Sequence, residues 1–414
     1  MSRAAQEPAK DTLGELVLNL HQFGGTASRA ALTEQLGCGR SVMGYLLGEL
    51  TSRDLVTVDR TTGRASGAEG GRPSHQVRIA DDAPVVIAAQ LNPDTISAAR
   101  IGLGGRIFQR VEQALPSGTA ADALVELCQL IGDVLPADLP VLGIGLAVPS
   151  PVRLADGHAR AALHLGWPAV ALRDLFRAEL DRHDALRGVP ADLANDANLA
   201  ALAEYRHGAG RGAVQLLYLA TGHVGLGGAL ISEGRLFRGA HGYAIEPGHI
   251  TVDPAGAACV CGSTGCLEIE ADHRGLLRAL GEDDVPLPDV TAAVAKALAD
   301  AVAGDAVVLA AVRRINAHLG NGLASLINIT DTDRIVLGGS LGRFYALAPE
   351  VVHEQLAARS FLSNDFPGSD GLDEDIAIVG EQLPDSALLG AAELAWQPLF
   401  IDPKRTLDAL HAPA

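Results

Sequence analysis

His249 is followed, after nine residues, by the run Cys259-Val260-Cys261-Gly262-Ser263-Thr264-Gly265-Cys266-Leu267-Glu268. Three of the five cysteines in this 414-residue chain fall within eight positions of that run. The two glycines between the second and third cysteines let the backbone turn sharply enough for the thiolates to face one point. Three thiolates and one imidazole form a closed tetrahedral set that is typical of structural zinc, and soft thiolates favour zinc over magnesium or calcium. The alternative is a chance group of reduced cysteines, but the close spacing favours a zinc site formed by His249, Cys259, Cys261 and Cys266.

The residues around this run resemble a known family. Three runs are similar to the signature of the ROK family, which groups repressors, open reading frames and sugar kinases. In chain order they are Gly239-Ala240-His241-Gly242, Glu246-Pro247-Gly248-His249 and Cys-x-Cys-Gly-x-x-Gly-Cys-x-Glu. The resemblance extends more loosely over nearly the whole chain. It implies an actin-like (ribonuclease H-like, sugar kinase type) α/β fold with two domains around a cleft.

The composition indicates a globular protein of two or three domains, with 48% hydrophobic and 20% charged residues. The net charge of −18 is unevenly spread, because residues 1–80 hold nine Lys and Arg against eight Asp and Glu. Only this first segment could approach a phosphate backbone without strong repulsion. The chain opens without a secretory signal pattern and has no apolar run long enough to span a bilayer, so we expect a cytoplasmic protein without membrane contact.

Residues 1–80 show the pattern of a winged helix-turn-helix domain. Apolar spacing predicts a helix capped by Asp11 or Thr12 that ends at Gly24-Gly25, a second helix capped by Ser28, and a third over 39–51. Two short segments with strand character, 55–58 and 76–79, flank a Gly-, Ser- and Arg-rich wing over 61–74.

The third helix would enter the major groove of double-stranded DNA. Arg40, Ser41 and Tyr45 lie off its apolar face and could touch DNA, and Arg72 in the wing suits a minor groove or a phosphate. The alternative is a protein-interaction module, because this helix is poor in Lys and Arg. Repressors of the family carry such an N-terminal domain, whereas its sugar kinases lack it.

The remaining chain is predicted to form two α/β domains, over 81–196 with a closing C-terminal helix at 387–400, and over 197–386. In kinases of the family, the first hairpin carries Asp-x-Gly-Gly-Thr, whose backbone amides hold the ATP phosphates. Here the corresponding turn reads Gln90-Leu91-Asn92-Pro93-Asp94-Thr95, which lacks both glycines and the leading acid, and Pro93 removes an amide donor. We therefore expect that the protein is not an enzyme.

The family resemblance implies a sugar-binding wall made of Asn195, Asp196, Glu246, His249 and Glu268. Asp196 stands at the position of the kinase general base, although Asn-Asp at a helix start is also a common cap. His249 would serve sugar and zinc at once. The family's Ala-Gly-Glu-x-Gly-His appears here with Ile245 in place of the first Gly. A β-branched residue lacks the backbone freedom of Gly, so we expect a pocket of altered shape.

These features favour a sugar-responsive transcriptional regulator of carbohydrate metabolism, a repressor that binds operator DNA and senses a sugar or sugar-phosphate effector as a homodimer or homotetramer. Ligand contacts would shift a cleft equilibrium and change the spacing of two DNA-binding heads. One alternative is a sugar kinase with an added DNA-binding domain, which Asp196 favours and the turn at 90–95 opposes. Another is a ligand-independent regulator controlled by a protein partner, which Ile245 favours, together with Ser150 where the family's Gly-x-Pro-Gly-Pro-Val turn has Gly.

Overall fold

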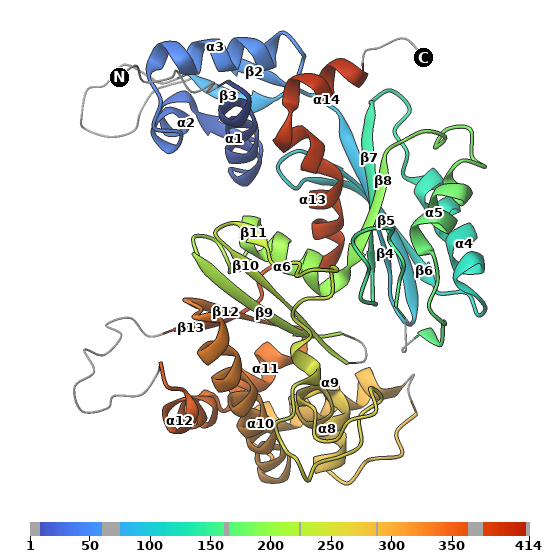
Figure 1. Ribbon diagram of the computed structural model, residues 1–414, viewed down its shortest axis with the longest axis vertical. Helices are drawn as coiled ribbons and strands as arrows, with labels where there is room; N and C mark the ends of the chain where they lie inside the picture. The colour runs from blue at the N-terminus through green and yellow to red at the C-terminus, as the bar shows by residue number, and fades with distance from the viewer. Residues whose placement is uncertain are drawn as a thin grey trace. The chain divides into compact units, whose positions relative to one another are not determined.

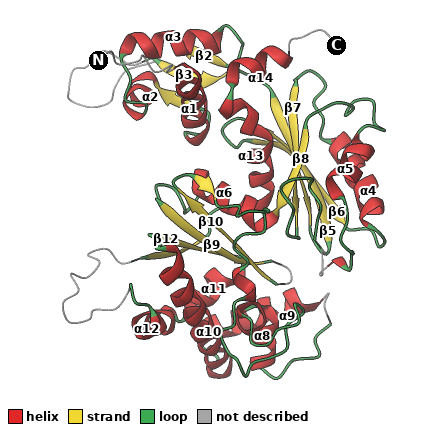
Figure 2. Cartoon of the chain, in the orientation of Figure 1, coloured by secondary structure: helices red, strands yellow, loops and turns green. Residues whose placement is uncertain are grey.

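The computed structural model describes residues 9–59, 75–160, 165–222, 225–286, 289–362 and 376–410 (Figure 1). The chain divides into two compact units, and Figure 2 shows that both contain helices and strands. Unit 1 comprises Met1–Ala147, Arg173–Leu193 and Ala391–Ala414, and unit 2 comprises Val148–Leu172 and Ala194–Gly390.

Unit 1 begins with a winged helix-turn-helix domain. Helices α1 (Ala9–Gln22), α2 (Arg29–Gln35) and α3 (Arg40–Thr51) accompany an antiparallel sheet of order β1-β3-β2, formed by Thr26–Ser28, Gln76–Ile79 and Val56–Asp59. The Ser28 hydroxyl accepts the Ala31 amide at 3.1 Å and caps α2, as the sequence predicts.

Three details of this domain differ from the prediction or lie outside the described residues. Helix α1 begins at Ala9, so neither Asp11 nor Thr12 is its N-cap, because Ala and Lys before them are strong helix formers that extend the first turn. The short strand β1 pairs with β3 and was not predicted. The wing over 61–74, with Arg72, lies outside the described residues.

The first α/β sheet, in unit 1, has the order β6-β5-β4-β7-β8. Its strands are β4 (Val85–Leu91), β5 (Thr95–Gly102), β6 (Ile107–Ala114), β7 (Val141–Val148) and β8 (Ala191–Asn195). The meander β4-β5-β6 is antiparallel, and β7 joins β4 in parallel after helix α4 (Ala120–Asp133). Helices α5 (Leu172–Leu180), α13 (Ser386–Ile401) and α14 (Pro403–Leu410) complete this part. A Cβ at Gly145 would overlap the Ala391 carbonyl oxygen, so β7 and α13 are in direct backbone contact.

Unit 2 contains a five-stranded sheet of order β11-β10-β9-β12-β13. These strands span Arg235–Leu236, Leu226–Ser232, Gln215–Thr221, Arg334–Gly338 and Ala377–Gly380. One face packs on a large apolar core that includes residues of the long helix α10 (Ala306–Thr330). The other helices are α6 (Asp196–His207), α7 (Leu267–Ala271), α8 (His273–Ala279), α9 (Val290–Val302), α11 (Ser340–Leu347) and α12 (Pro349–Arg359).

The unit boundaries differ from those predicted at 80/81, 196/197 and 386/387. Residues 148–172 group with unit 2, because the Leu154 amide donates to the His241 carbonyl at 2.9 Å and Gly242 leaves no room for a side chain beside Val152 and Leu154. The winged domain groups with the first sheet, and α13 changes unit between Gly390 and Ala391. Sequence periodicity cannot show such contacts between distant segments.

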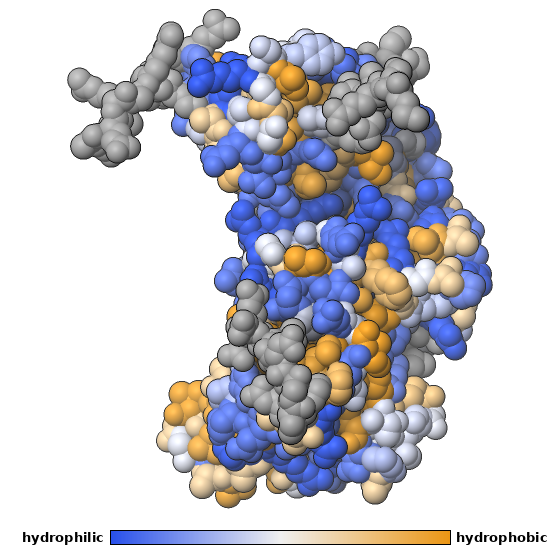
Figure 3. Space-filling model, turned by 60° about the vertical axis from the view of Figure 1, so that its left-hand side comes forward, coloured by the Kyte–Doolittle hydropathy of each residue, from blue (hydrophilic) through white to orange (hydrophobic). Residues whose placement is uncertain are grey.

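The described surface is mixed in polarity, with apolar patches set among polar residues on the face drawn in Figure 3. Within the described ranges, no helix combines the length and the apolar character needed to cross a bilayer.

Candidate functional site

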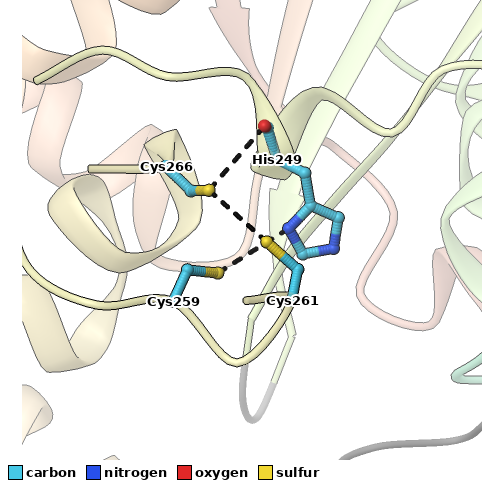
Figure 4. Close-up of side chains that lie close together, drawn as sticks. All are labelled: His249, Cys259, Cys261 and Cys266. Atoms are coloured by element: carbon cyan, nitrogen blue, oxygen red, sulfur yellow. Dashed lines mark hydrogen bonds between the residues drawn. The ribbon is translucent and has the colours of Figure 1, made fainter. Parts of the chain in front are cut away.

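The predicted zinc ligands of unit 2 lie together. The ligand atoms of His249, Cys259, Cys261 and Cys266 are all within 4.8 Å of one another, and the four side chains point toward a common centre (Figure 4). The Cys259 Sγ is 3.8 Å from the His249 Nδ1, and the Cys261 Sγ is 3.7 Å from the Cys266 Sγ. A tetrahedral ion with bonds of ~2.3 Å to sulfur separates its ligands by about 3.8 Å. The donor set and spacing therefore fit a structural zinc ion.

Hydrogen bonds hold the cysteine loop in this shape. Gly265 has φ +58°, its amide donates to the Ala257 carbonyl at 2.8 Å, and its carbonyl accepts the Val252 amide at 2.8 Å. The buried Glu270 carboxylate accepts the Ala257 amide at 2.7 Å. Glu270 was not among the residues predicted from the sequence motif. The sequence could have indicated it only as a second acid two residues after Glu268.

Asn195 and Asp196 open α6 and are bound to each other. The Asn195 Oδ1 accepts the Asn198 amide at 3.0 Å, so the predicted alternative role as a helix cap is present. The Asn195 Nδ2 donates to the Asp196 Oδ1 at 3.0 Å and to the Ser150 carbonyl at 3.4 Å. These bonds fix the Asp196 carboxylate at the helix N-terminus, where the positive end of the helix dipole favours negative charge.

Glu246 lies within electrostatic range of both Asp196 and Glu268. Burial raises the pKa of Asp196 to about 6. Burial and the charges of Asp196 and Glu268 raise the pKa of Glu246 to about 7, although part of Glu246 reaches solvent, and Arg160 opposes this rise. Glu268 is buried and accepts the Leu226 amide at 3.1 Å. Glu246 thus links the three acids into one carboxylate group, in which it is repelled by the other two. Their oxygens can accept hydrogen bonds from hydroxyls.

The metal cluster and the carboxylate group share chain segments. His249 ends a 3₁₀ turn (Pro247–His249) directly after Glu246, and Cys266 caps α7, whose second residue is Glu268. A Cβ at Gly248 would lie 3.3 Å from the Glu268 Cβ, so the two segments touch at this point. An ion held by His249 and Cys266 therefore orients both glutamates indirectly.

Ile245 has an unusual backbone conformation. Its φ is +64°, which is the left-handed conformation that glycine adopts easily and β-branched residues rarely adopt. The backbone is therefore strained at this position, and the altered pocket shape expected from Ile245 stays a prediction. The Ile245 side chain packs against the main core of unit 2, which offsets the backbone strain.

The turn between β4 and β5, in unit 1, satisfies its own polar groups. The Asn92 amide donates to the Thr95 carbonyl at 2.8 Å, and the Gln90 side chain donates to the Asn92 Oδ1 at 2.8 Å. The Asp94 carbonyl accepts the Leu115 amide at 2.8 Å. Pro93 has no amide hydrogen.

The predicted DNA contacts Arg40, Ser41 and Tyr45 are exposed on α3. The Arg29 guanidinium donates to the Arg40 carbonyl at 2.7 Å, which places a second cation beside the start of α3. Tyr45 is also contacted by α14, because the Lys404 Nζ is 3.3 Å from its hydroxyl and 5.5 Å from its ring centroid. Neither Arg29 nor Lys404 was among the predicted site residues, and only the folded chain brings them to α3.

Comparisons with known proteins agree with this architecture. The sequence model of the ROK family matches residues 87–397. A putative xylose repressor of a Caldicellulosiruptor species is 27% identical over 352 residues, which cover 82% of this chain and 85% of the repressor. A glucokinase of Halalkalibacterium halodurans is 35% identical over 214 residues, which cover 49% of this chain and only 62% of the glucokinase.

Among solved structures, a ROK family transcriptional regulator described as a homologue of the E. coli MLC protein has a TM-score of 0.72 at 21% identity. The superposition covers 97% of this chain and 99% of the regulator, so the likeness extends over both units and shows the fold. The winged helix-turn-helix followed by an actin-like two-domain fold is therefore confirmed. Because the family model matches about three quarters of its length, the chain belongs to the ROK family.

Proposed function

We propose that this protein is a sugar-responsive transcriptional repressor that binds operator DNA through the winged domain and a sugar or sugar derivative in unit 2. The observation that carries this proposal is the presence, in one chain, of an exposed helix α3 and of a carboxylate group braced by a Cys₃His cluster. The match to a xylose repressor over most of both chains supports it, and the match to glucokinases supports the sugar part alone.

Sugar recognition would rest on Asn195, Asp196, Glu246, His249 and Glu268. A sugar presents several hydroxyl donors at fixed spacing, and the three carboxylates supply acceptors for them. The zinc ion would act structurally, by holding the two segments that carry Glu246 and Glu268. The His249 Nδ1 is the ring nitrogen that faces Cys259. A metal ion bound at Nδ1 would leave the proton on Nε2, which could then donate to a sugar oxygen.

DNA recognition would rest on α3 and the neighbouring cations. Arg40, Ser41 and Tyr45 supply polar contacts, and Arg29 adds positive charge near the first turn. Arg72 is the candidate contact of the wing. A homodimer or homotetramer would place two such domains on a symmetric operator, so that a change in their separation alters affinity.

We also propose that the chain is not a sugar kinase. Asp196 and the glucokinase match favour a kinase. The turn at Gln90–Thr95 opposes it, because this turn pairs its own donors and contains Pro93 where a phosphate needs backbone amides. Mg-ATP consumption that depends on D-glucose or D-xylose would reverse this conclusion.

The test uses the zinc-loaded full-length protein and the DNA duplex that it enriches from a random-sequence library. D-xylose and D-glucose are titrated first by thermal unfolding, because a ligand that binds the native state raises the melting temperature. A bound sugar should then weaken DNA binding about tenfold, within the usual range of allosteric coupling. Glu268→Gln should lose the sugar response, and Glu350→Gln, a surface glutamate of the same unit, should keep it. Enrichment of no duplex, or a DNA affinity unaffected by either sugar, would contradict the proposal.

A further inference from the structure

Helix α13 carries a buried polar contact to the winged domain. Within unit 1, the His21 Nε2 of α1 is 2.7 Å from the Glu393 Oε1 of α13, and their side chains are only 1% and 3% exposed. A second contact lies seven residues away on both helices, because a Cβ at Gly14 would overlap the Phe400 carbonyl oxygen. The pairs 14/400 and 21/393 therefore set one antiparallel register between α1 and α13.

The hydrogen bonds of His21 fix its protonation state. The Gly104 amide, in the turn between β5 and β6, donates to the His21 Nδ1 at 2.7 Å. An amide is always a donor, so Nδ1 must be unprotonated and Nε2 carries the hydrogen that points to Glu393. One imidazole thus joins three segments, which are α1, the β5–β6 turn and α13.

The other end of α13 is held by α6 within unit 2. Glu204 of α6 is fully buried, and its Oε1 accepts the Gln382 and Leu383 amides, at 2.9 and 2.7 Å, just before α13 begins. A Cβ at Gly390 would overlap the Leu199 carbonyl oxygen of α6, so the two helix backbones touch. The first residue of α6 is Asp196.

We propose that α13 couples the sugar site to the DNA-binding domain, with Glu393–His21 as the joint at its far end. The inference rests on the function proposed above and adds the element that transmits the signal. A change at Asp196 on sugar binding would move α6, and α6 holds the start of α13 through Leu199 and Glu204. The same continuous helix bears Glu393 four residues after its first turn.

The joint has the property that a switch requires. Hydrogen bonds weaken steeply with distance and angle, and losing a hydrogen bond between two buried side chains is costly. A shift of α13 along α1 therefore has two outcomes. Either the His21–Glu393 hydrogen bond is kept, or it breaks and the winged domain loses its register with α13. Glu393 and His21 are positioning residues in this scheme, since neither touches sugar or DNA.

The experiment compares Glu393→Ala and Glu393→Gln in the zinc-loaded full chain. Gln keeps an acceptor for the His21 Nε2 hydrogen, and Ala removes it. For each protein, the affinity for D-xylose and D-glucose is measured by calorimetry, and the affinity for the duplex enriched by the wild type is measured with and without sugar. Asp408→Ala is the matched control, because it breaks the exposed Arg53–Asp408 pair at 2.8 Å between the winged domain and α14.

All variants should still bind the sugar that the wild type binds, because none of the substituted residues belongs to the sugar site. The response of DNA affinity to sugar, about tenfold in the wild type, should fall below about twofold in Glu393→Ala and persist in Glu393→Gln and Asp408→Ala. If Glu393→Ala does not fold, the double variant His21→Leu/Glu393→Leu fills the same space with apolar groups and should lose the response in the same way.

A full response in Glu393→Ala or in the double variant would overturn the coupling role and leave the proposed function intact. A wild type that binds neither sugar would instead remove the proposed function, together with the inference built on it.

Discussion

Replacing Ile245 by Gly and by Ala separates backbone strain from side-chain loss. Ile245 has φ +64°, and a left-handed conformation costs a non-glycine residue ~1–2 kcal/mol. Both substitutions remove the side chain that packs on the core of unit 2, so this loss cancels in their comparison. Ala keeps the strain, whereas Gly relieves it but loses more conformational entropy on folding, by roughly 0.5–1 kcal/mol. We therefore expect Ile245→Gly to be more stable than Ile245→Ala by about 0.5–1 kcal/mol.

Ile250 provides a matched control in the same segment. It packs against the same core and has φ −73°. There, the Gly variant should be less stable than the Ala variant by roughly 0.5–1 kcal/mol, because no strain is relieved. The sign of the Gly–Ala difference should thus reverse between positions 245 and 250.

Urea unfolding of the zinc-loaded protein measures these differences directly from the transition midpoints. In thermal unfolding, 1 kcal/mol corresponds to roughly 2–4 °C for a unit of this size. If Ile245→Gly is less stable than Ile245→Ala by the amount found at Ile250, position 245 is not strained and the reasoning from its backbone conformation is wrong.

Three further substitutions test the site and its supports. Cys266→Ser should lose the bound metal and have a lower melting temperature than the wild type when both are measured with zinc present. The metal content of the purified variant is the check, and a full zinc complement would contradict the ligand assignment. Glu204→Gln should destabilise unit 2 by ~1–3 kcal/mol in urea unfolding. The reason is that the two carboxylate oxygens both accept hydrogen bonds from backbone amides, and the NH₂ group of Gln would face one of these donors. An unchanged unfolding midpoint would refute this. The pKa of Glu246 is raised to about 7 from 4.5, so its contribution to stability is present below pH 4.5 and is lost as the pH rises through 7. Glu246→Gln should therefore gain stability relative to the wild type between pH 5 and pH 8, and a constant difference across this range would disprove the shift.

Local patterns in the sequence were sufficient for most elements and for the His/Cys₃ cluster. The cysteine spacing with His249 is a short-range property, so the cluster could be predicted before any fold was known. Ser28 as a helix cap and the strands expected over 55–58 and 76–79 follow equally from local residue types. The family resemblance grouped Asp196, Glu246 and Glu268, and the electrostatic coupling of Glu246 to the other two agrees with that grouping.

Contacts between distant segments could not be predicted in this way. His21 was one polar residue at the end of an amphipathic helix, and nothing nearby indicated a partner 372 positions away. Glu204 likewise had no feature in the sequence that indicated a special role. Only the fold shows that its carboxylate accepts the Gln382 amide just before α13. The conformation of Ile245 could not be predicted from residue preference, because β-branched residues rarely adopt the left-handed backbone that the surrounding structure holds here.

The pairing of α1 with α13 also has a consequence for the order of events during synthesis. The helix that carries His21 leaves the ribosome before Glu393, which is made 372 residues later. At ~5–20 residues per second, the first helix waits roughly 20–75 s before its buried face can be covered. During this interval the winged domain must rely on its own small core, so a nascent chain would expose Gly14 and His21 to chaperones and to other nascent copies.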